Sequence, residues 1–189
     1  NYPNELERPL LLSLIQLLWD RGEANGYAHN MTTDPLANTP PHEVLLQAAM
    51  GDHQVANVAA EVEARTIGAS VYTPALKAGR HWDANPFLGI PQIDMGGASK
   101  PPYTGGSMLV YYDGGPVSFT GTRGQGSGTA PSANVPPRPE WGYGGDPHGY
   151  PRAAADGLLQ EGSFLRGEGV PQCIDSTRLC FSNGYTGTP

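Results

Sequence analysis

The serines of this chain do not lie in the sequence context that a catalytic serine elbow requires. An elbow has the form G-x-S-x-G, because small residues on both sides allow the serine Oγ to project from a strained turn between a strand and a helix. None of the serines has glycine at both the −2 and the +2 position. The sequence therefore predicts no serine nucleophile of this type within its 189 residues.

An aspartate and a histidine stand where acid–base chemistry could be placed. Asp52 follows the apolar run of residues 43–49 in a Met-Gly-Asp turn, and His148 lies between two prolines in the segment DPHGYPR. As purely structural residues, Asp52 would close a turn and His148 would be a surface histidine in a loop. His53 is an alternative base and Asp20 an alternative acid. Because the side chains of neighbouring turn residues diverge, His53 is less well placed than His148 to reach both an acid and a nucleophile.

The other histidines and a glycine-rich segment give no pattern for a metal ion or a cofactor. Among His29, His81 and Asp83, only His81-x-Asp83 has a compact spacing, and two residues do not complete a ligand set. Residues 124–128 (GQGSG) lack the preceding strand, the following helix and the lysine of a phosphate-binding loop. We therefore expect neither a metal nor a cofactor.

The elements that must position Asp52 and His148 can be read from the apolar pattern. Residues 43–49 are expected to form a buried strand, because the apolar run is short and lies between Pro40-Pro41 and Gly51. Residues 57–67 follow as a helix, with Asn57 as its N-cap and Gly68 as its stop signal. A second strand is predicted over residues 107–112, and a last helix over residues 151–165.

The first predicted helix, residues 9–20, is apolar on nearly all of its faces. Such a helix needs cover from other elements on more than one side. The two predicted strands cannot supply it, since the mean sheet has about 5 to 6 strands. The chain is therefore expected to be part of a larger fold, with this helix buried at the junction.

Composition excludes two classes of function. The chain has 11 Lys+Arg and 18 Asp+Glu, a net charge of −7, and no basic run that could hold a phosphate backbone, so nucleic acid is not expected as a partner. The longest apolar stretch, residues 10–19, is shorter than the roughly 20 residues of a membrane span. Residues 1–20 lack the basic segment of a signal peptide, so any targeting segment is expected to lie upstream or to have been removed.

The two cysteines predict a compartment. Cys173 and Cys180 have no second pair nearby that would complete a zinc site, so a local disulfide is favoured. A disulfide indicates an oxidising environment and hence a secreted or periplasmic protein. The alternative is two reduced, buried cysteines in a cytosolic protein.

The strand, Gly-Asp turn and helix of residues 44–67 resemble the segment that carries the acid of the α/β-hydrolases. The motif is VLLQAAMGDHQV followed by the helix from Asn57. The resemblance extends over about residues 9–166 and implies that Asp52 orients the catalytic imidazole and stabilises its cation. It also implies that His148, on the loop after the strand 107–112, is that imidazole. Because the family order is Ser, acid, His, the serine is expected upstream or on a separate chain.

This resemblance implies an α/β fold: the C-terminal part of an α/β-hydrolase sheet with flanking helices and a long Gly/Pro-rich loop region. Residues 1–189 would belong to a single hydrolase domain, with residues 80–145 as a loop-rich insertion or lid and residues 167–189 as a disulfide-pinned tail. A second polypeptide would supply the nucleophile and the oxyanion hole, and this chain alone would be inactive. The substrate would be a small ester or amide. Tyr111, Tyr112, Trp141, Tyr143 and Tyr150 could line its pocket.

Two other functions fit the same sequence. One is a non-catalytic, secreted binding or structural module in which Asp52 and His148 never meet. The other is a peptidase of the same fold, which shares the triad and differs in its pocket and lid. Contact between the Asp52 and His148 side chains separates the first of these from a hydrolase.

Overall fold

A computed structural model describes residues 3–52, 54–81, 83–115 and 146–187 of the chain. The chain folds as two compact units, Asn1–Glu43 and Val44–Pro189. We describe each unit by itself. Residues 116–145, which make up much of the predicted lid, lie outside the described residues.

The first unit is helical. Helix α1 covers Arg8–Trp19, in agreement with the predicted helix 9–20, and is followed by a 3-10 turn, η1 (Ala24–Tyr27), and a short helix, α2 (His29–Thr32). None of the α1 residues is buried, and its large apolar side chains are exposed: Leu10, Leu12, Leu14, Leu17, Leu18 and Trp19. The expected cover of this helix by another polypeptide therefore stays a prediction.

The second unit is built on a parallel four-stranded sheet with flanking helices, which makes it an α/β fold. Its strands are β1 (Leu45–Ala49), β2 (Ser70–Thr73), β3 (Gln92–Asp94) and β4 (Met108–Tyr112), in the spatial order β1-β4-β2-β3. Strands β1 and β4 pair over their full length, from Leu45↔Met108 to Ala49↔Tyr112. All five residues of β4 are buried, as expected for a central strand of a parallel sheet.

The sequence predicted only two of these strands. Strands β2 and β3 have four and three residues, too few to show a periodicity. The count of two strands was therefore wrong. Strands β3 and β4 both fall within residues 80–145, the range predicted as a loop-rich insertion or lid.

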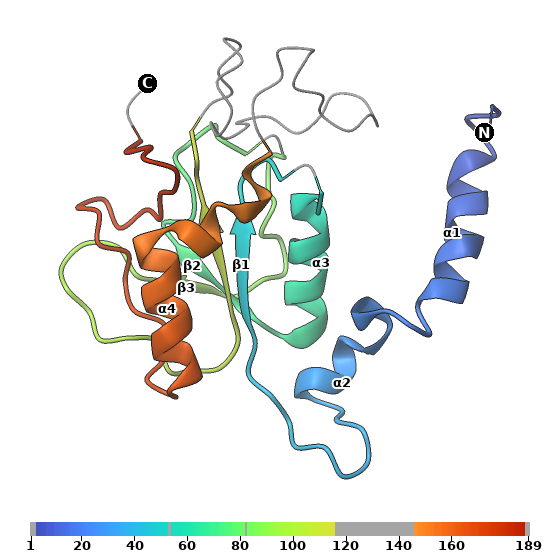
Figure 1. Ribbon diagram of the computed structural model, residues 1–189, viewed down its shortest axis with the longest axis horizontal. Helices are drawn as coiled ribbons and strands as arrows, with labels where there is room; N and C mark the ends of the chain where they lie inside the picture. Colours follow the sequence, from blue (N-terminus) through green and yellow to red (C-terminus); the bar gives the residue numbers. More distant parts are fainter. Residues whose placement is uncertain (1–2, 53, 82, 116–145, 188–189) are drawn as a thin grey trace. The chain divides into compact units, whose positions relative to one another are not determined.

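Helices α3 (Asn57–Ile67) and α4 (Ala155–Leu165) cover opposite faces of the sheet, and Figure 1 shows them on either side of β1. Consecutive residues of a strand point to opposite faces. On β4, the Tyr111 hydroxyl donates to Glu61 of α3, and the Tyr112 hydroxyl donates to Gln160 of α4. The predicted helix 151–165 begins later than expected, because residues Pro151–Ala153 form a separate 3-10 turn, η4.

Within the described residues, no helix has the length and apolar character needed to cross a lipid bilayer.

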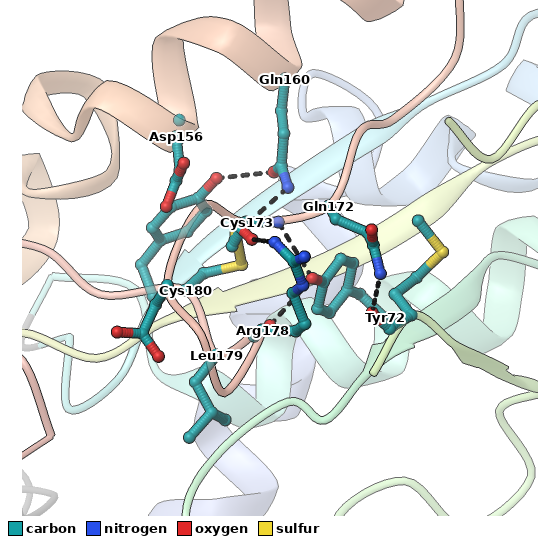
Figure 2. Close-up of a disulfide and its surroundings, with 12 residues drawn as sticks. Tyr72, Asp156, Gln160, Gln172, Cys173, Arg178, Leu179 and Cys180 are labelled. Atoms are coloured by element: carbon teal, nitrogen blue, oxygen red, sulfur yellow. Dashed lines mark hydrogen bonds between the residues drawn. A yellow bond between two sulfur atoms is a disulfide. The ribbon is translucent and has the colours of Figure 1, made fainter. Parts of the chain in front are cut away.

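The C-terminal segment belongs to the core and is not a peripheral tail. Val170, Cys173 and Cys180 are buried in one cluster with Tyr72 and Tyr112 of the sheet. The predicted disulfide between Cys173 and Cys180 is present. Figure 2 shows the polar groups around it, where the Gln160 amide lies next to Cys173 and the Arg178 guanidinium donates to the Cys173 carbonyl at 3.1 Å.

The tyrosine of β2 joins this segment to the sheet. The Tyr72 hydroxyl accepts from the Cys173 backbone N–H at 3.0 Å and donates to the Arg178 carbonyl at 2.8 Å. Burial raises the pKa of Tyr72, so its hydroxyl keeps the proton that this second bond requires. Tyr72 therefore holds the disulfide loop at Cys173 and at Arg178.

Replacing both cysteines by alanine is expected to lower the free energy of unfolding by about 2 to 3 kcal/mol, because the disulfide closes a short loop in the unfolded chain. Urea titration followed by circular dichroism measures the difference from the wild type. The native spectrum should be unchanged, since the Tyr72 hydroxyl bonds to the backbone groups of residues 173 and 178, and these bonds remain. A loss well below 1 kcal/mol would contradict this estimate.

Candidate functional site

The structure brings the side chains of Asp52 and His148 together. The His148 Nδ1 lies 2.8 Å from the Asp52 Oδ2, although the two residues are far apart in the sequence. The other carboxylate oxygen, Oδ1, accepts from the backbone N–H groups of Gln54 and Val55 at 2.8 and 2.9 Å. With a carboxylate beside it, Nδ1 is assigned the proton, which leaves the Nε2 lone pair as the basic position of a neutral imidazole.

The two side chains differ in their access to solvent. The Asp52 side chain is 9% exposed and the His148 side chain 30% exposed. The acid is therefore shielded while the imidazole can be reached from outside. This is the division that a base oriented by a carboxylate needs, because the base must contact a reactant and the acid must not.

The turn between β1 and α3 fixes Asp52. Gly51 has a φ of 79°, a left-handed conformation that glycine adopts without strain. Asn57 is buried, and its amide donates to the Ala49 carbonyl and accepts from the Gly51 N–H. The expectation that Asn57 is the N-cap was wrong, since Ala56 occupies that position and the Asn57 side chain closes the turn instead.

His148 is held by a 3-10 turn, η3 (Pro147–Gly149), which Asp146 caps by accepting from the His148 N–H at 3.0 Å. The Gln54 amide then donates to the other Asp146 oxygen at 2.9 Å. Gln54 therefore joins two loops. Its backbone N–H donates to Asp52, and its side-chain amide donates to Asp146 in the loop that carries His148. Sequence reasoning missed both Gln54 and Asp146. The only signal was an aspartate directly before a proline, which favours a capped turn.

Gln54→Ala should loosen His148 without unfolding the chain. In proton NMR, the Nδ1 proton between His148 and Asp52 should give a resolved downfield signal in the wild type. The signal should broaden in Gln54→Ala, because the proton exchanges faster with water, and should be lost in Asp52→Asn. The matched control is Gln47→Ala, since Gln47 also lies beside the site but donates to Gly157. An unchanged signal in Gln54→Ala would show that the Gln54 amide does not hold the loop.

A pocket of about 350 Å³ opens beside the dyad. Asp52 and His148 line it together with three consecutive residues of β1 (Leu46, Gln47 and Ala48) and with α3 residues that include Ala59 and Ala60. Because consecutive strand residues point to opposite faces, a pocket lined by three of them runs along the edge of β1, where no strand of the described residues pairs with it. Of the described residues that line it, none is a serine, threonine or cysteine.

The alternative candidates are placed elsewhere or not described. Asp20 belongs to the first unit, where it ends α1 and accepts from the Gln16 amide at 2.6 Å. His53, Trp141 and Tyr143 lie outside the described residues. Tyr111 and Tyr112 do not line the pocket, because both are buried and their hydroxyls donate to side chains of α3 and α4. Burial raises the pKa of both tyrosines.

His81 and Asp83 meet a third residue, Glu61, and their ligand atoms lie within 4.8 Å of one another. Hydrogen bonds already fix the tautomer of the His81 imidazole, however. Its Nδ1 accepts from the Asp83 backbone N–H at 3.0 Å, so Nε2 carries the proton and donates it to Glu61 at 3.0 Å. A histidine that binds a metal needs a free lone pair on one ring nitrogen, while its other ring nitrogen donates an N–H to an acceptor. This cluster therefore acts as a hydrogen-bonded link from α3 to His81 and Asp83.

Comparison of this chain with protein-family models, curated proteins and solved structures finds no match.

Proposed function

We propose that this chain is the acid–base part of a serine hydrolase of the α/β-hydrolase type. The observation that carries the proposal is the Asp52–His148 pair, in which a shielded carboxylate meets Nδ1 of an accessible imidazole. Asp52 lies just after β1 and His148 on the chain that follows the neighbouring strand, β4. Functional groups of parallel α/β sheets gather at the carboxyl ends of adjacent strands, which is where these two lie.

The chemistry follows from the protonation of His148. Its Nε2 takes the proton of a serine hydroxyl as the serine oxygen attacks the carbonyl carbon of an ester. The imidazolium beside Asp52 then gives that proton to the leaving alcohol as the ester C–O bond breaks. Water attacks the acyl-enzyme in the same manner, with His148 again accepting and returning one proton, and releases the acid. Asp52 keeps the ring in the required tautomer throughout.

The nucleophile would come from a second polypeptide that packs along the free edge of β1. In the described sheet β1 has one neighbour, β4, and the pocket with Asp52 and His148 opens on its other side. A strand added in parallel to this edge would end beside His148, because parallel strands bring their carboxyl ends to one edge. The same polypeptide would supply the oxyanion hole and cover the exposed leucines of α1.

The buried disulfide and the absence of a membrane-spanning helix among the described residues are compatible with an extracellular protein. We infer that the chain is secreted or periplasmic. The substrate would be a small ester or amide. A peptidase of the same fold would use the same Asp52–His148 pair. A non-catalytic module is the remaining alternative, and the direct contact between Asp52 and His148 favours the hydrolase over it.

A serine-reactive fluorophosphonate tests the proposal on the native material. The reagent labels an activated serine, and mass spectrometry under denaturing conditions identifies the chain that carries the label. We expect a labelled second chain that copurifies with this one, and loss of the label in His148→Ala while the two chains stay associated. A folded, monomeric chain of 20.0 kDa with no labelled companion would overturn the proposal.

A further inference from the structure

The pocket beside the Asp52–His148 pair contains an arginine, Arg152, which lines it together with His148. Arg152 is exposed, and its guanidinium has no hydrogen-bond or ion-pair partner among the described residues. Every other described lysine and arginine of the second unit donates to a protein acceptor: Arg65, Lys77, Arg80, Lys100, Arg166 and Arg178. Within the described part of this unit, Arg152 is therefore the cation that remains available to a ligand.

The backbone holds Arg152 close to His148. Arg152 belongs to η4, which directly follows the turn η3 that carries His148. Both turns contact β1, and Figure 1 shows them beside its arrowhead. The Ala154 N–H donates to the carbonyl of Tyr150 at 3.1 Å, while the Tyr150 side chain does not line this pocket. A Cβ on Gly149 would stand 3.8 Å from the Arg152 Nη2, so the guanidinium lies against the residue that follows His148.

The acidic groups of the pocket leave this positive charge in place. Asp52 is shielded, and its oxygens already accept from His148 and from the backbone of residues 54 and 55. Glu63 lines the pocket from α3, and residues 57–63 of that helix span about 9 Å along its axis. Because α3 starts at the carboxyl end of β1 and leads back to the start of the parallel strand β2, Glu63 lies toward the opposite end of the pocket.

We propose that Arg152 binds a carboxylate on the substrate, so that the preferred substrates are anionic esters or amides. This inference rests on the proposed function. A guanidinium donates two parallel hydrogen bonds to a carboxylate and carries the opposite charge. A phosphate has more oxygens to satisfy, and the amides of Gln47 and Asn57 in this pocket already donate to the carbonyls of Gly157 and Ala49. One guanidinium by itself matches a carboxylate.

Two pairs of esters test the inference on the native two-chain material. The monoester 4-nitrophenyl adipate and 4-nitrophenyl hexanoate differ by a carboxylate on the acyl group, and 4-acetoxybenzoate and phenyl acetate differ by one on the leaving group. In at least one pair, kcat/KM should be about tenfold higher for the anionic ester, the effect of one hydrogen bond between charged groups. Raising the salt concentration should reduce this preference, because salt screens an exposed charge.

Arg152→Gln should lower the ratio of kcat/KM for the anionic and the neutral ester about tenfold, and Arg152→Glu should lower it further. Both variants should fold, since Arg152 is exposed and has no partner among the described residues. Arg166→Gln is the matched control and should keep the wild-type ratio, because the Arg166 guanidinium pairs with Glu168 and does not line the pocket.

Two results would overturn the inference while leaving the proposed function intact. One is equal kcat/KM for the anionic and the neutral ester in both pairs. The other is a ratio that neither Arg152 variant changes. If the native material hydrolyses none of the esters, the proposed function fails and this inference fails with it.

Discussion

His148→Ala is expected to lower the rate of ester hydrolysis by the assembled two-chain enzyme about 10⁶-fold, the usual effect of removing the base of a serine triad. Without the imidazole, no group at this position removes the proton from the serine hydroxyl. Steady-state hydrolysis of a p-nitrophenyl ester measures the effect, with the association of the two chains checked by size-exclusion chromatography. His29→Ala, in α2 of the first unit, should leave the rate unchanged.

Asp52→Asn should lower the rate about 10⁴-fold, because an amide in place of the carboxylate favours the wrong imidazole tautomer. The double variant should be no slower than His148→Ala alone, since the two residues act as a unit. Rates within tenfold of the wild type for both single variants would show that the pair is structural. That outcome would leave the non-catalytic module as the better description.

Arg80→Met is expected to lower the free energy of unfolding by about 3 to 5 kcal/mol, the usual cost of leaving one partner of a buried ion pair without the other. Asp113 is buried at the end of β4, and its carboxylate accepts from two nitrogens of the Arg80 guanidinium. The same bonds raise the pKa of Arg80. Urea titration monitored by circular dichroism gives the change.

Lys100→Met provides the control for this measurement. Lys100 pairs with Asp94 at 2.9 Å, but the two side chains are 34% and 78% exposed. Water already solvates both charges, so the free energy of unfolding of Lys100→Met should stay close to that of the wild type. An equal decrease in the free energy of unfolding for Arg80→Met and Lys100→Met would mean that the burial of Asp113 does not determine the size of the effect.

The sequence identified the residues of the candidate site better than the fold that surrounds them. Asp52 and His148 could be found because their segments resemble those that carry the acid and the histidine of the α/β-hydrolases, each after a short apolar strand. The structure puts their side chains in contact, and their catalytic role stays a prediction. Strands β2 and β3 could not be found, because they are too short for a period and their pairing depends on β4 and on one another.

The polar side chains that hold Asp52 and His148 in place could not be predicted from the sequence either. Gln54 and Asp146 meet only after the chain has folded, and neither residue type indicates such a contact. Asn57 was taken for a helix cap because asparagine is common there, but its amide closes the turn instead. Local propensity reflects the conformation that a residue favours within its own segment. Gln54, Asp146 and Asn57 instead make side-chain contacts with other segments.

The burial of the disulfide sets the order of events in the maturation of this protein. Cys173 and Cys180 are 0% and 1% exposed, so a thiolate from an oxidoreductase cannot reach either sulfur once the second unit has folded. The bond must therefore form before or during closure of the core. A chain that folded while still reduced would have to open again to be oxidised. Mild reductants that cannot unfold the protein should likewise leave the bond intact.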